Sequence, residues 1–374
     1  MAHAYTPGLK VVEYMTIVKE RRLPLPGEIL VEAGDRVKAE DIVARTDLPG
    51  NVQTLNVAGL LGILPEEIES TMLKKPGEAI KKDEVIAESK GFFGLFKSQV
   101  RSPIDGVIES ASKITGQVIL REPPIRVEVS AYIDGEVIEI LGKEGVKIRS
   151  RGSFIQGIFG VGGEVVGIIR RVVEGPDEVL TEAKINDDCQ GQILIGGSGV
   201  EIGAIQKAAR LGAKGIVVGA IEDQVLRSYL GYDIGVAITG QEKVPVTLII
   251  TEGFGRLKMA ERTFRLLVRH EGKKASINGA TQIRAGVIRP EVIVPHDEKP
   301  TVEKRTVEME QGLTVGMPVR IIREPYFGRL GKVASLPVEL TQIETEAKVR
   351  VLEVELDDRT RILLPRANVE IIEE

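Results

Sequence analysis

The fold is decided by a stretch that occurs twice in the chain, first as Gly34-Asp-Arg-Val-Lys-Ala-Glu-Asp-Ile-Val-Ala44 and then as Gly77-Glu-Ala-Ile-Lys-Lys-Asp-Glu-Val-Ile-Ala87. Glycine, acid, branched apolar residue and lysine recur in the same order in both copies. A Gly-acid pair suits a tight turn, and the Val and Ile positions that follow return the chain as a strand. Because a half-motif of this size cannot bury a core alone, we expect the two copies to pack face to face as one small sandwich.

A third signature, Ser102-Pro-Ile-Asp-Gly-Val-Ile-Glu109, follows the second copy. The whole pattern resembles the biotinyl/lipoyl-like barrel-sandwich hybrid family, and the resemblance implies one such module over residues 1–130. Carriers of that family hold their cofactor on a hairpin lysine, for which the candidate here is Lys90 in Glu88-Ser-Lys-Gly91. The Met-Lys-Met and Asp-Lys-Ala tripeptides of family carriers are both missing at this position, and an apolar segment follows. We therefore expect no covalent cofactor.

Composition limits the class of protein. A chain of 374 residues, 43% hydrophobic and 28% charged, is typical of a globular protein with two to four domains. The net charge of −5 provides no bulk cationic field for nucleic acid or anionic lipid. The single cysteine, Cys189, excludes an intrachain disulfide and a cysteine-ligated zinc or iron–sulfur site within one chain, and we expect no metal. No signal pattern opens the chain, and the longest uncharged apolar stretch, residues 57–64, is too short to span a bilayer. These observations favour a cytoplasmic protein without membrane contact.

The pattern changes along the rest of the chain. Residues 131–185 predict a small, glycine-rich β module or extension. Strand and helix patterns then alternate over 186–294, which is typical of an α/β domain with a largely parallel sheet. The polar, proline-bounded segment 295–311 predicts a linker, and residues 312–374 are β again. The expected fold class is thus multidomain and mainly β, with one α/β domain.

A glycine-rich loop lies between a predicted strand and helix of the α/β domain, in Ile195-Gly-Gly-Ser-Gly-Val-Glu-Ile-Gly203. Glycines there let backbone N–H groups approach a phosphate at the helix N-terminus. The spacing is one residue longer than that of the usual dinucleotide fingerprint, and no lysine follows in the P-loop position. The candidate phosphate-binding residues are Gly196, Gly197, Ser198, Gly199 and Gly203.

The C-terminal region contains Gly316-Met-Pro-Val-Arg-Ile-Ile-Arg-Glu-Pro-Tyr-Phe-Gly-Arg-Leu-Gly-Lys-Val333, which resembles the KOW motif. With the strands that follow, it is similar to the SH3-like barrel at the C-terminus of the NusG/Spt5 elongation factors. That family implies binding to RNA, RNA polymerase or ribosomal proteins. Cations beside aromatic rings suit phosphate contact and base stacking, and the candidate partner- or RNA-binding residues are Arg320, Arg323, Tyr326, Phe327, Arg329 and Lys332. Because residues 301–374 carry more acids than bases, a protein partner or a purely structural barrel remains an alternative.

Side chains that could perform chemistry are not grouped in any recognisable catalytic pattern. Cys189 follows Asp187 and Asp188, whose charges disfavour a thiolate nucleophile. The leading interpretation is therefore a non-catalytic adaptor or scaffold on a nucleic-acid machine, namely RNA polymerase, the ribosome or RNA, that docks through its KOW barrel. The alternative is an enzyme or regulator that binds a nucleotide or another phosphorylated ligand at the glycine loop.

Overall fold

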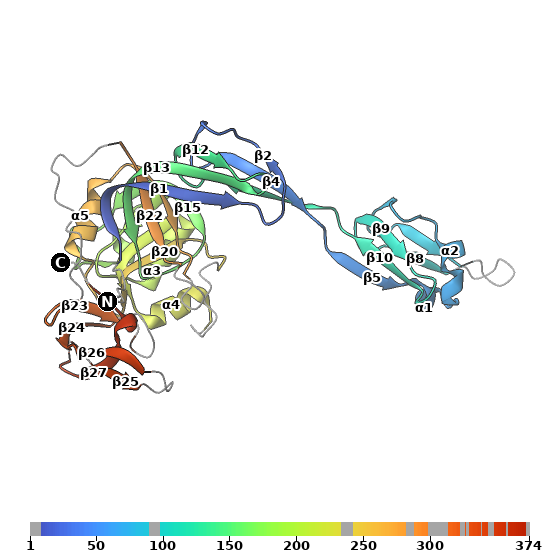
Figure 1. Ribbon diagram of the computed structural model, residues 1–374. Coiled ribbons are helices and arrows are strands. Elements are labelled where there is room, and N and C mark those ends of the chain that lie inside the picture. The colour runs from blue at the N-terminus through green and yellow to red at the C-terminus, as the bar shows by residue number, and fades with distance from the viewer. Residues whose placement is uncertain are drawn as a thin grey trace.

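The chain folds into an elongated molecule in which a body of sheet and helices carries a C-terminal module, and an arm of two β modules extends from the body (Figure 1). The computed structural model describes residues 9–89, 98–232, 242–281, 288–297, 313–321, 326, 329–337, 339–342, 348–356 and 358–371. Strands dominate over helices, as the sequence predicts. None of the helices in these ranges is long and apolar enough to span a bilayer.

The body is built on an 11-stranded sheet with the order β14-β20-β19-β17-β15-β21-β22-β13-β12-β3 and with β1 paired to β13. Its parallel part consists of β15 (Glu164–Arg171), β17 (Gln192–Ile195), β19 (Gly215–Ile221) and β20 (Thr247–Phe254). The helices are α3 (Ile202–Arg210), α4 (Asp223–Leu230) and α5 (Glu261–Arg269). The other body strands are β14 (Phe159–Val161), β21 (Lys274–Asn278) and β22 (Glu291–Pro295), and β16 (Val179–Leu180) pairs with β18 (Gly199–Val200) beside η2 (Glu182–Lys184).

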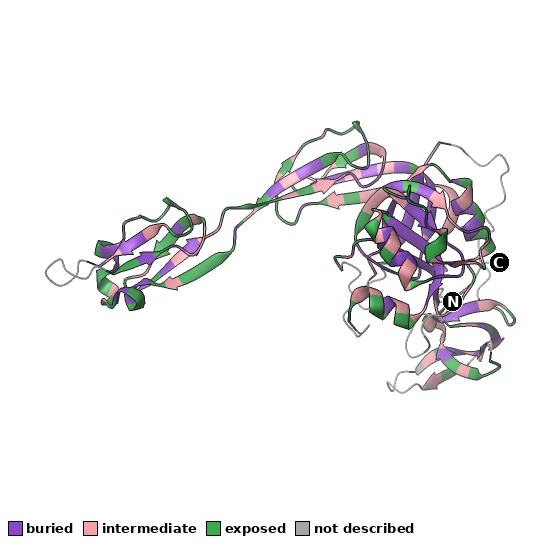
Figure 2. Cartoon of the chain, turned by 180° about the vertical axis from the view of Figure 1, so that it is seen from behind, coloured by how far each residue is buried: buried purple, intermediate pink, exposed green. Residues whose placement is uncertain are grey.

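Apolar runs explain the burial of this parallel sheet. Every residue of β19 is buried, which is typical of a parallel strand with both faces covered. Purple, buried strands fill the centre of the body in Figure 2, while the helices keep exposed outer faces. The alternation of strand and helix predicted for 186–294 is therefore present, and the sheet extends upstream to include β15.

The proximal module is the part of the arm next to the body. It contains β2 (Glu28–Ile29), β3 (Arg36–Val37), β4 (Ile42–Leu48), β11 (Ile125–Ser130) and β12 (Gly135–Ile140). Two long strands, β1 (Val11–Arg22) and β13 (Gly145–Gln156), run from this module into the body sheet. Its core includes Val37, Val43, Tyr132 and Val137.

The distal module lies at the far end of the arm. It contains β5 (Val52–Asn56), α1 (Val57–Leu61), η1 (Pro65–Glu67), α2 (Ile68–Thr71), β6 (Ala79–Ile80), β7 (Val85–Glu88), β8 (Gln99–Arg101), β9 (Gly106–Ala111) and β10 (Gln117–Arg121). Its core is separate from that of the proximal module and includes Ile80, Ile86, Ile108 and Leu120.

A narrow neck of two extended segments joins the modules (Figure 1). The backbones approach closely here, because a Cβ built on Gly50 would lie 2.0 Å from the Glu122 carbonyl oxygen. The Asn51 carbonyl accepts from the Glu122 N–H at 2.9 Å, and the Asn51 amide donates to the Glu122 carboxylate at 2.8 Å. Only glycine fits at position 50, so the sequence fixes where the two segments meet.

The two copies of the repeat belong to different cores, which corrects the expectation that they pack into one sandwich. Val37 and Val43 of the first copy lie in the proximal core, whereas Ile80 and Ile86 of the second lie in the distal core. Each copy finds its own partner strands, so each buries a core without the other. Since β11 and β12 lie on either side of residue 130 within the proximal module, residues 131–140 continue that module, as an extension of the first module would.

Backbone hydrogen bonds show that each copy of the repeat pairs with an equivalent Ile-Asp-Gly segment. The Gly34 N–H donates to the Val137 carbonyl at 2.7 Å, and the Gly77 N–H donates to the Ile108 carbonyl at the same distance. Carboxylates repeat the match: Asp134 Oδ1 accepts from the Ala39 N–H at 2.7 Å, and Asp105 Oδ1 accepts from the Lys82 N–H at 2.9 Å. Ile133-Asp-Gly135 is thus the structural counterpart of Ile104-Asp-Gly106.

Strand order extends this equivalence over both modules. The order β3-β12-β13-β1 in the proximal module matches β6-β9-β10-β5 in the distal module. Register shifts also recur at matching places in the pairs β4–β11 and β7–β8. In the distal module β7 and β8 are neighbours in sequence, whereas the matching β4 and β11 are separated by the entire distal module. The second copy is therefore inserted into the first at the position of a hairpin.

The C-terminal module is a 6-stranded antiparallel sheet with its own core. It contains β23 (Pro318–Ile321), β24 (Leu330–Ser335), β25 (Leu340–Gln342), β26 (Lys348–Leu356), β27 (Arg361–Pro365), η3 (Arg366–Asn368) and β28 (Val369–Ile371). Val319 and Ile321 point into this core, as their alternation predicts.

Candidate functional surfaces

Arg320, the first candidate of the C-terminal module, is buried against the body. Its Nη2 atom lies 2.5 Å from Oε2 of Glu252 on β20, and the two side chains are 4% and 9% exposed. The other carboxylate oxygen of Glu252 accepts from the Ala260 N–H at 3.0 Å, next to the start of α5. Arg320 therefore attaches the C-terminal module to the body, which corrects its assignment to a partner- or RNA-binding surface.

The remaining candidates of this module do not form one cationic surface. Arg329 pairs with Asp358 at 2.7 Å, and this guanidinium is the main cause that holds the Asp358 pKa at about 2, below its usual value. Tyr326 packs against the module core, while Lys332 is exposed on β24. Two further candidates, Arg323 and Phe327, lie outside the described residues.

The glycine loop of the body is covered by a neighbouring segment of the chain. The Gly196 N–H donates to the Val217 carbonyl at 2.9 Å, and the Ser198 N–H donates to the Glu178 carbonyl at 2.9 Å. A Cβ on Gly197 would lie 2.4 Å from the Glu178 carbonyl oxygen. These glycines serve close packing of backbone on backbone, so the amides at 196 and 198 are not presented to a phosphate.

The start of α3 has an anion of the chain itself beside it. A Cβ built on Gly203 would lie 2.9 Å from Oε2 of Glu182, which places this carboxylate at the positive end of the helix. Gly199 belongs to β18, which pairs with β16. Gly196, Gly197 and Ser198 are thus packed against the chain itself and Gly203 lies beside a carboxylate, which argues against the interpretation of this loop as a phosphate-binding site.

Cys189 is buried, and its pKa is raised mainly by that burial, with a smaller contribution from Asp188. The direction agrees with the expectation of an unreactive thiol, although burial rather than charge is the larger cause. Lys90, the candidate for a carrier lysine, lies outside the described residues. Within the described ranges, no group of three or more His, Cys, Asp and Glu is placed to hold a metal ion.

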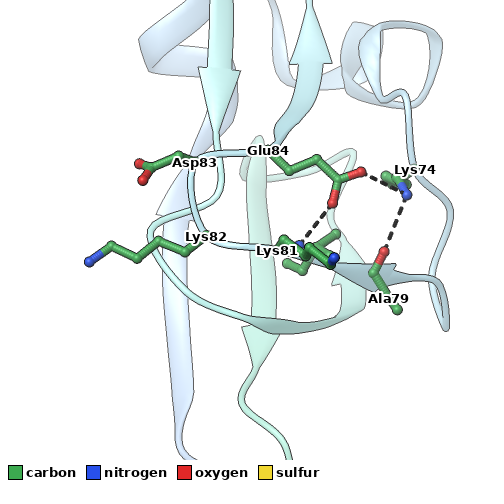
Figure 3. Close-up of a pocket in the computed structure, with 7 residues that line it drawn as sticks. Lys74, Ala79, Lys81, Lys82, Asp83 and Glu84 are labelled. Carbon is green, nitrogen blue, oxygen red and sulfur yellow. Dashed lines mark hydrogen bonds and ion pairs between the residues drawn. The ribbon is translucent and has the colours of Figure 1, made fainter.

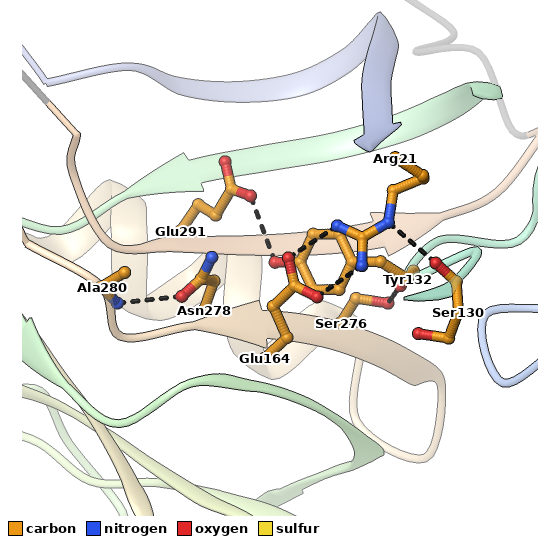
Figure 4. A network of polar contacts seen from close by, with 8 residues as sticks. All are labelled: Arg21, Ser130, Tyr132, Glu164, Ser276, Asn278, Ala280 and Glu291. Atoms are coloured by element: carbon orange, nitrogen blue, oxygen red, sulfur yellow. Dashed lines mark hydrogen bonds and ion pairs between the residues drawn. The ribbon is translucent and has the colours of Figure 1, made fainter. Parts of the chain in front are cut away.

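Sequence reasoning missed a polar network at the root of the arm (Figure 4). Arg21 of β1 makes two hydrogen bonds to Glu164 of β15, at 2.7 and 2.6 Å, and its Nε donates to the Ser130 carbonyl at 2.8 Å. Tyr132, fully buried with φ at 68°, donates to Glu291 of β22 at 3.1 Å. Burial and the charges of Glu291 and Glu164 raise the Tyr132 pKa well above its ordinary value, so the phenol remains a donor in this network.

A second contact at this root joins the proximal module to β21. Lys274 Nζ lies 2.6 Å from Asp134 Oδ1 and 3.1 Å from Glu40 Oε2. Burial alone would lower the Lys274 pKa, but the hydrogen bonds that its ammonium donates to Asp134 and Glu40 raise it overall. On the same strand, the Ser276 hydroxyl donates to the Tyr132 carbonyl. The first repeat copy is therefore docked on the body through its own turn.

Another missed cluster brings two histidines to one serine in the body. Ser153 Oγ donates to the Glu13 carbonyl at 2.6 Å and lies 2.7 and 3.0 Å from Nε2 of His270 and His296. His296 Nε2 also lies 3.2 Å from the same Glu13 carbonyl oxygen, so the serine, the two imidazoles and this carbonyl form one cluster. His270 is the C-cap residue of α5, and the serine hydroxyl is buried among these partners, which favours a structural junction over a nucleophile.

The turn of the second repeat copy lines a shallow depression in the distal module (Figure 3). Lys74 Nζ lies 2.9 Å from Glu84 Oε1 and 3.3 Å from the Ala79 carbonyl oxygen. The hydrogen bond from Lys74 is the largest cause that lowers the Glu84 pKa, followed by the bond from the Lys81 N–H. These contacts fix the turn and leave Lys82 and Asp83 extended to the outside (Figure 3).

Comparison with known protein families and with curated proteins finds no match to this chain.

Proposed function

We propose that this protein is a non-catalytic adaptor, with the distal module at one end and the body with the C-terminal module at the other. The observation that supports this function is the arm, which holds the distal module on a narrow neck away from the body (Figure 1). The root of the arm is fixed by the ion pairs of Arg21 and Lys274. Such an arrangement suits a spacer between two partners, because each end presents its surface separately.

The finer assignments are part of this proposal. The hydrogen-bond match between the two copies supports a barrel-sandwich hybrid in each arm module, and the strand order of residues 313–371 supports an SH3-like KOW barrel. Both resemblances point to a nucleic-acid machine, with RNA polymerase or the ribosome as the partner class. Burial of Arg320 favours contact with a protein of that machine over direct contact with RNA phosphates.

The alternative of a nucleotide- or phosphate-dependent enzyme gains no support from the geometry. Its loop is packed beneath residues 175–180, and the carboxylate of Glu182 lies at the helix start where a phosphate would sit. A phosphate there would meet like charge.

Affinity capture from native lysate, with and without nuclease, tests the adaptor function. The variant replaces residues 49–124 by a short Gly-Asn turn, which the fold allows because Leu48 and Ile125 are register partners in β4 and β11. We expect RNA polymerase or ribosomal proteins on the intact chain, a subset of them lost with the distal module, and no effect of nuclease. Identical recovery by the intact and deleted chains would refute a two-ended adaptor, and loss on nuclease treatment would place RNA in the contact.

A further inference from the structure

The arm has two joints of different construction, the root beside the body and the neck between its two modules (Figure 1). At the root, buried side chains continue from one core into the next. β13 contributes Ile148 to the proximal core and Ile155 to the body core, and β22 contributes Ile293 and Val294 in the same way. Buried apolar side chains on shared strands resist bending, because a displacement would disturb the packing of both cores.

Polar contacts across the root are also largely shielded from water. Lys19 of β1 pairs with Glu291 at 2.6 Å, and their side chains are 24% and 10% exposed. Arg21 makes two hydrogen bonds to Glu164 and lies over the ring of the buried Tyr132. Since β1 and β13 also run from the proximal module into the body sheet, the proximal module and the body share one framework.

The neck lacks such a framework. No apolar side chain is buried between Ala44 and Val57 on one segment, or between Leu120 and Ala131 on the other, and the structure describes both segments throughout. The proximal and distal cores are therefore separated by a stretch without a buried apolar side chain. Burial of apolar surface, the main force that holds the root, is missing here.

Prolines interrupt the main-chain ladder at the neck. Leu48 is the register partner of Ile125 in the proximal module, and Val52 is the partner of Arg121 in the distal module. Three prolines, at positions 49, 123 and 124, lie between these two pairs, and proline has no N–H to donate. No main-chain hydrogen bond joins residues 49–50 to residues 123–124, all of which the structure describes. The ribbon that links the modules is thus open in the middle.

The contacts that remain at the neck are few and polar. Besides the two hydrogen bonds between Asn51 and Glu122, Arg121 Nη1 donates to the Gly50 carbonyl at 3.1 Å. The close approach of Gly50 to the Glu122 carbonyl fixes the crossing of the two segments at one point. A crossing held at one point restrains the distance between the segments more than the angle between them, and polar bonds at a surface exchange with water at modest net cost.

We propose that the neck is the hinge of the arm. The proximal module moves with the body as one rigid unit, and the distal module, residues 52–121, changes its orientation about the crossing of Gly50 and Glu122. Relative motion is the expected behaviour of two cores joined by so small an interface. The hinge adds a property to the proposed adaptor without depending on that function. The distal end meets a partner over a range of angles, and binding selects one of them.

Pulsed electron paramagnetic resonance on the spin-labelled full-length chain tests the hinge. The single cysteine, Cys189, is buried, so labels attach at introduced cysteines. The pair Glu128→Cys and Ser110→Cys spans the neck from β11 to β9. The pair Glu128→Cys and Ser228→Cys spans the root from β11 to α4, and all three native side chains are exposed. We expect a broad distribution of distances across the neck and a narrow one across the root.

Two alanine variants locate the motion. Asn51→Ala removes the amide that donates to the Glu122 carboxylate, so it should widen the distribution across the neck further and leave that across the root unchanged. Gln99→Ala is the matched control, because it removes the same kind of amide-to-carboxylate hydrogen bond, to Glu88 at 2.9 Å, from inside the distal module. This control should change neither distribution.

Residual dipolar couplings of the isotope-labelled native chain provide a second measurement that needs no substitution. The distal module should differ in alignment magnitude from the proximal module and the body, which should share one alignment. The proposal is overturned by equal widths across the neck and the root, by equal responses to the two alanine variants, or by couplings of the whole chain that fit a single alignment. If the neck is rigid while lysate capture still depends on residues 49–124, the hinge is wrong and the adaptor function stands.

Discussion

Replacing Arg320 by methionine should detach the C-terminal module from the body. The substitution leaves Glu252 buried without its cation, and with side-chain exposures of 4% and 9% water does not replace the lost partner. Removal of one member of a buried ion pair costs about 3–5 kcal/mol. The Glu252 side chain stays in place because its other oxygen still accepts from the Ala260 N–H. We therefore expect the free energy of docking to fall by about this amount.

The C-terminal module contains its own control. Arg329 and Asp358 form an ion pair at 2.7 Å with exposures of 44% and 49%, and exposed pairs contribute about 0–1 kcal/mol. Arg329→Met removes the same chemical group from the same module without leaving a buried charge. Native-state hydrogen exchange in β23 and β20 measures both variants on the full chain and separates undocking from global unfolding.

A double variant separates the cost of leaving the Glu252 charge buried and unpaired from the loss of the Arg320–Glu252 contact itself. Combining Arg320→Met with Glu252→Gln removes both charges, while the glutamine oxygen can still accept from Ala260. We expect this double variant to recover part of the loss caused by Arg320→Met alone. If Arg320→Met costs no more than Arg329→Met, the pair does not hold the module, and the reasoning from burial is refuted.

Two further predictions concern the neck and the body. Gly50→Ala should destabilise the arm by about 1–3 kcal/mol, because its Cβ would lie 2.0 Å from the Glu122 carbonyl oxygen, whereas Gly163→Ala enters open space and should be tolerated in calorimetric melting. Equal melting of the two variants would contradict the close approach in the neck. Burial raises the Tyr229 pKa to about 12 from 10.0, against the lowering effect of its hydrogen bond to Val246. The stability contributed by this phenol is complete below pH 10 and is lost as the pH rises through 12. The free energy of unfolding, measured by urea titration between pH 8 and 12, should therefore fall more steeply for the native chain than for Tyr229→Phe. Parallel curves for the two chains would show that this tyrosine does not contribute to the pH dependence.

The repeat could be found in the sequence, but its nesting could not. Turn chemistry at Gly34 and Gly77 is local and therefore visible in both copies. The pairing of β4 with β11 closes over the whole distal module. Because the entropic cost of closing a loop rises only slowly with its length, a long insertion is tolerated without a compensating local sequence signal. One signal was available: Ile133-Asp-Gly135 repeats Ile104-Asp-Gly106, and this match would have assigned a third signature to each copy.

The candidate residues were misjudged where burial by a distant segment decides their role. Alternation places Val319 and Ile321 in the core of the C-terminal module and Arg320 on the opposite face. Glu252, which lies 68 residues earlier in the chain, pairs with Arg320 on that face. No local sequence pattern predicts this ion pair. Gly197 likewise fits a phosphate loop in composition, whereas the backbone at 175–178 that packs against it is visible only in the fold.

The two modules of the arm use the same turn in different ways. In the proximal copy the turn that carries Glu40 has Ala39 beside it, and this turn closes on the body's own lysine. In the distal copy lysine replaces that alanine, and the carboxylates of Asp83 and Asp105 have no cation partner within the described residues. The same turn sequence thus builds a contact with the body in one module and an exposed loop in the other. The backbone differs as well, because Asp83 has φ at 65° where Glu40 does not, and Pro103 stands where Tyr132 is left-handed, so the distal turn keeps the hydrogen bond to Asp105 without the proximal arrangement of acceptors.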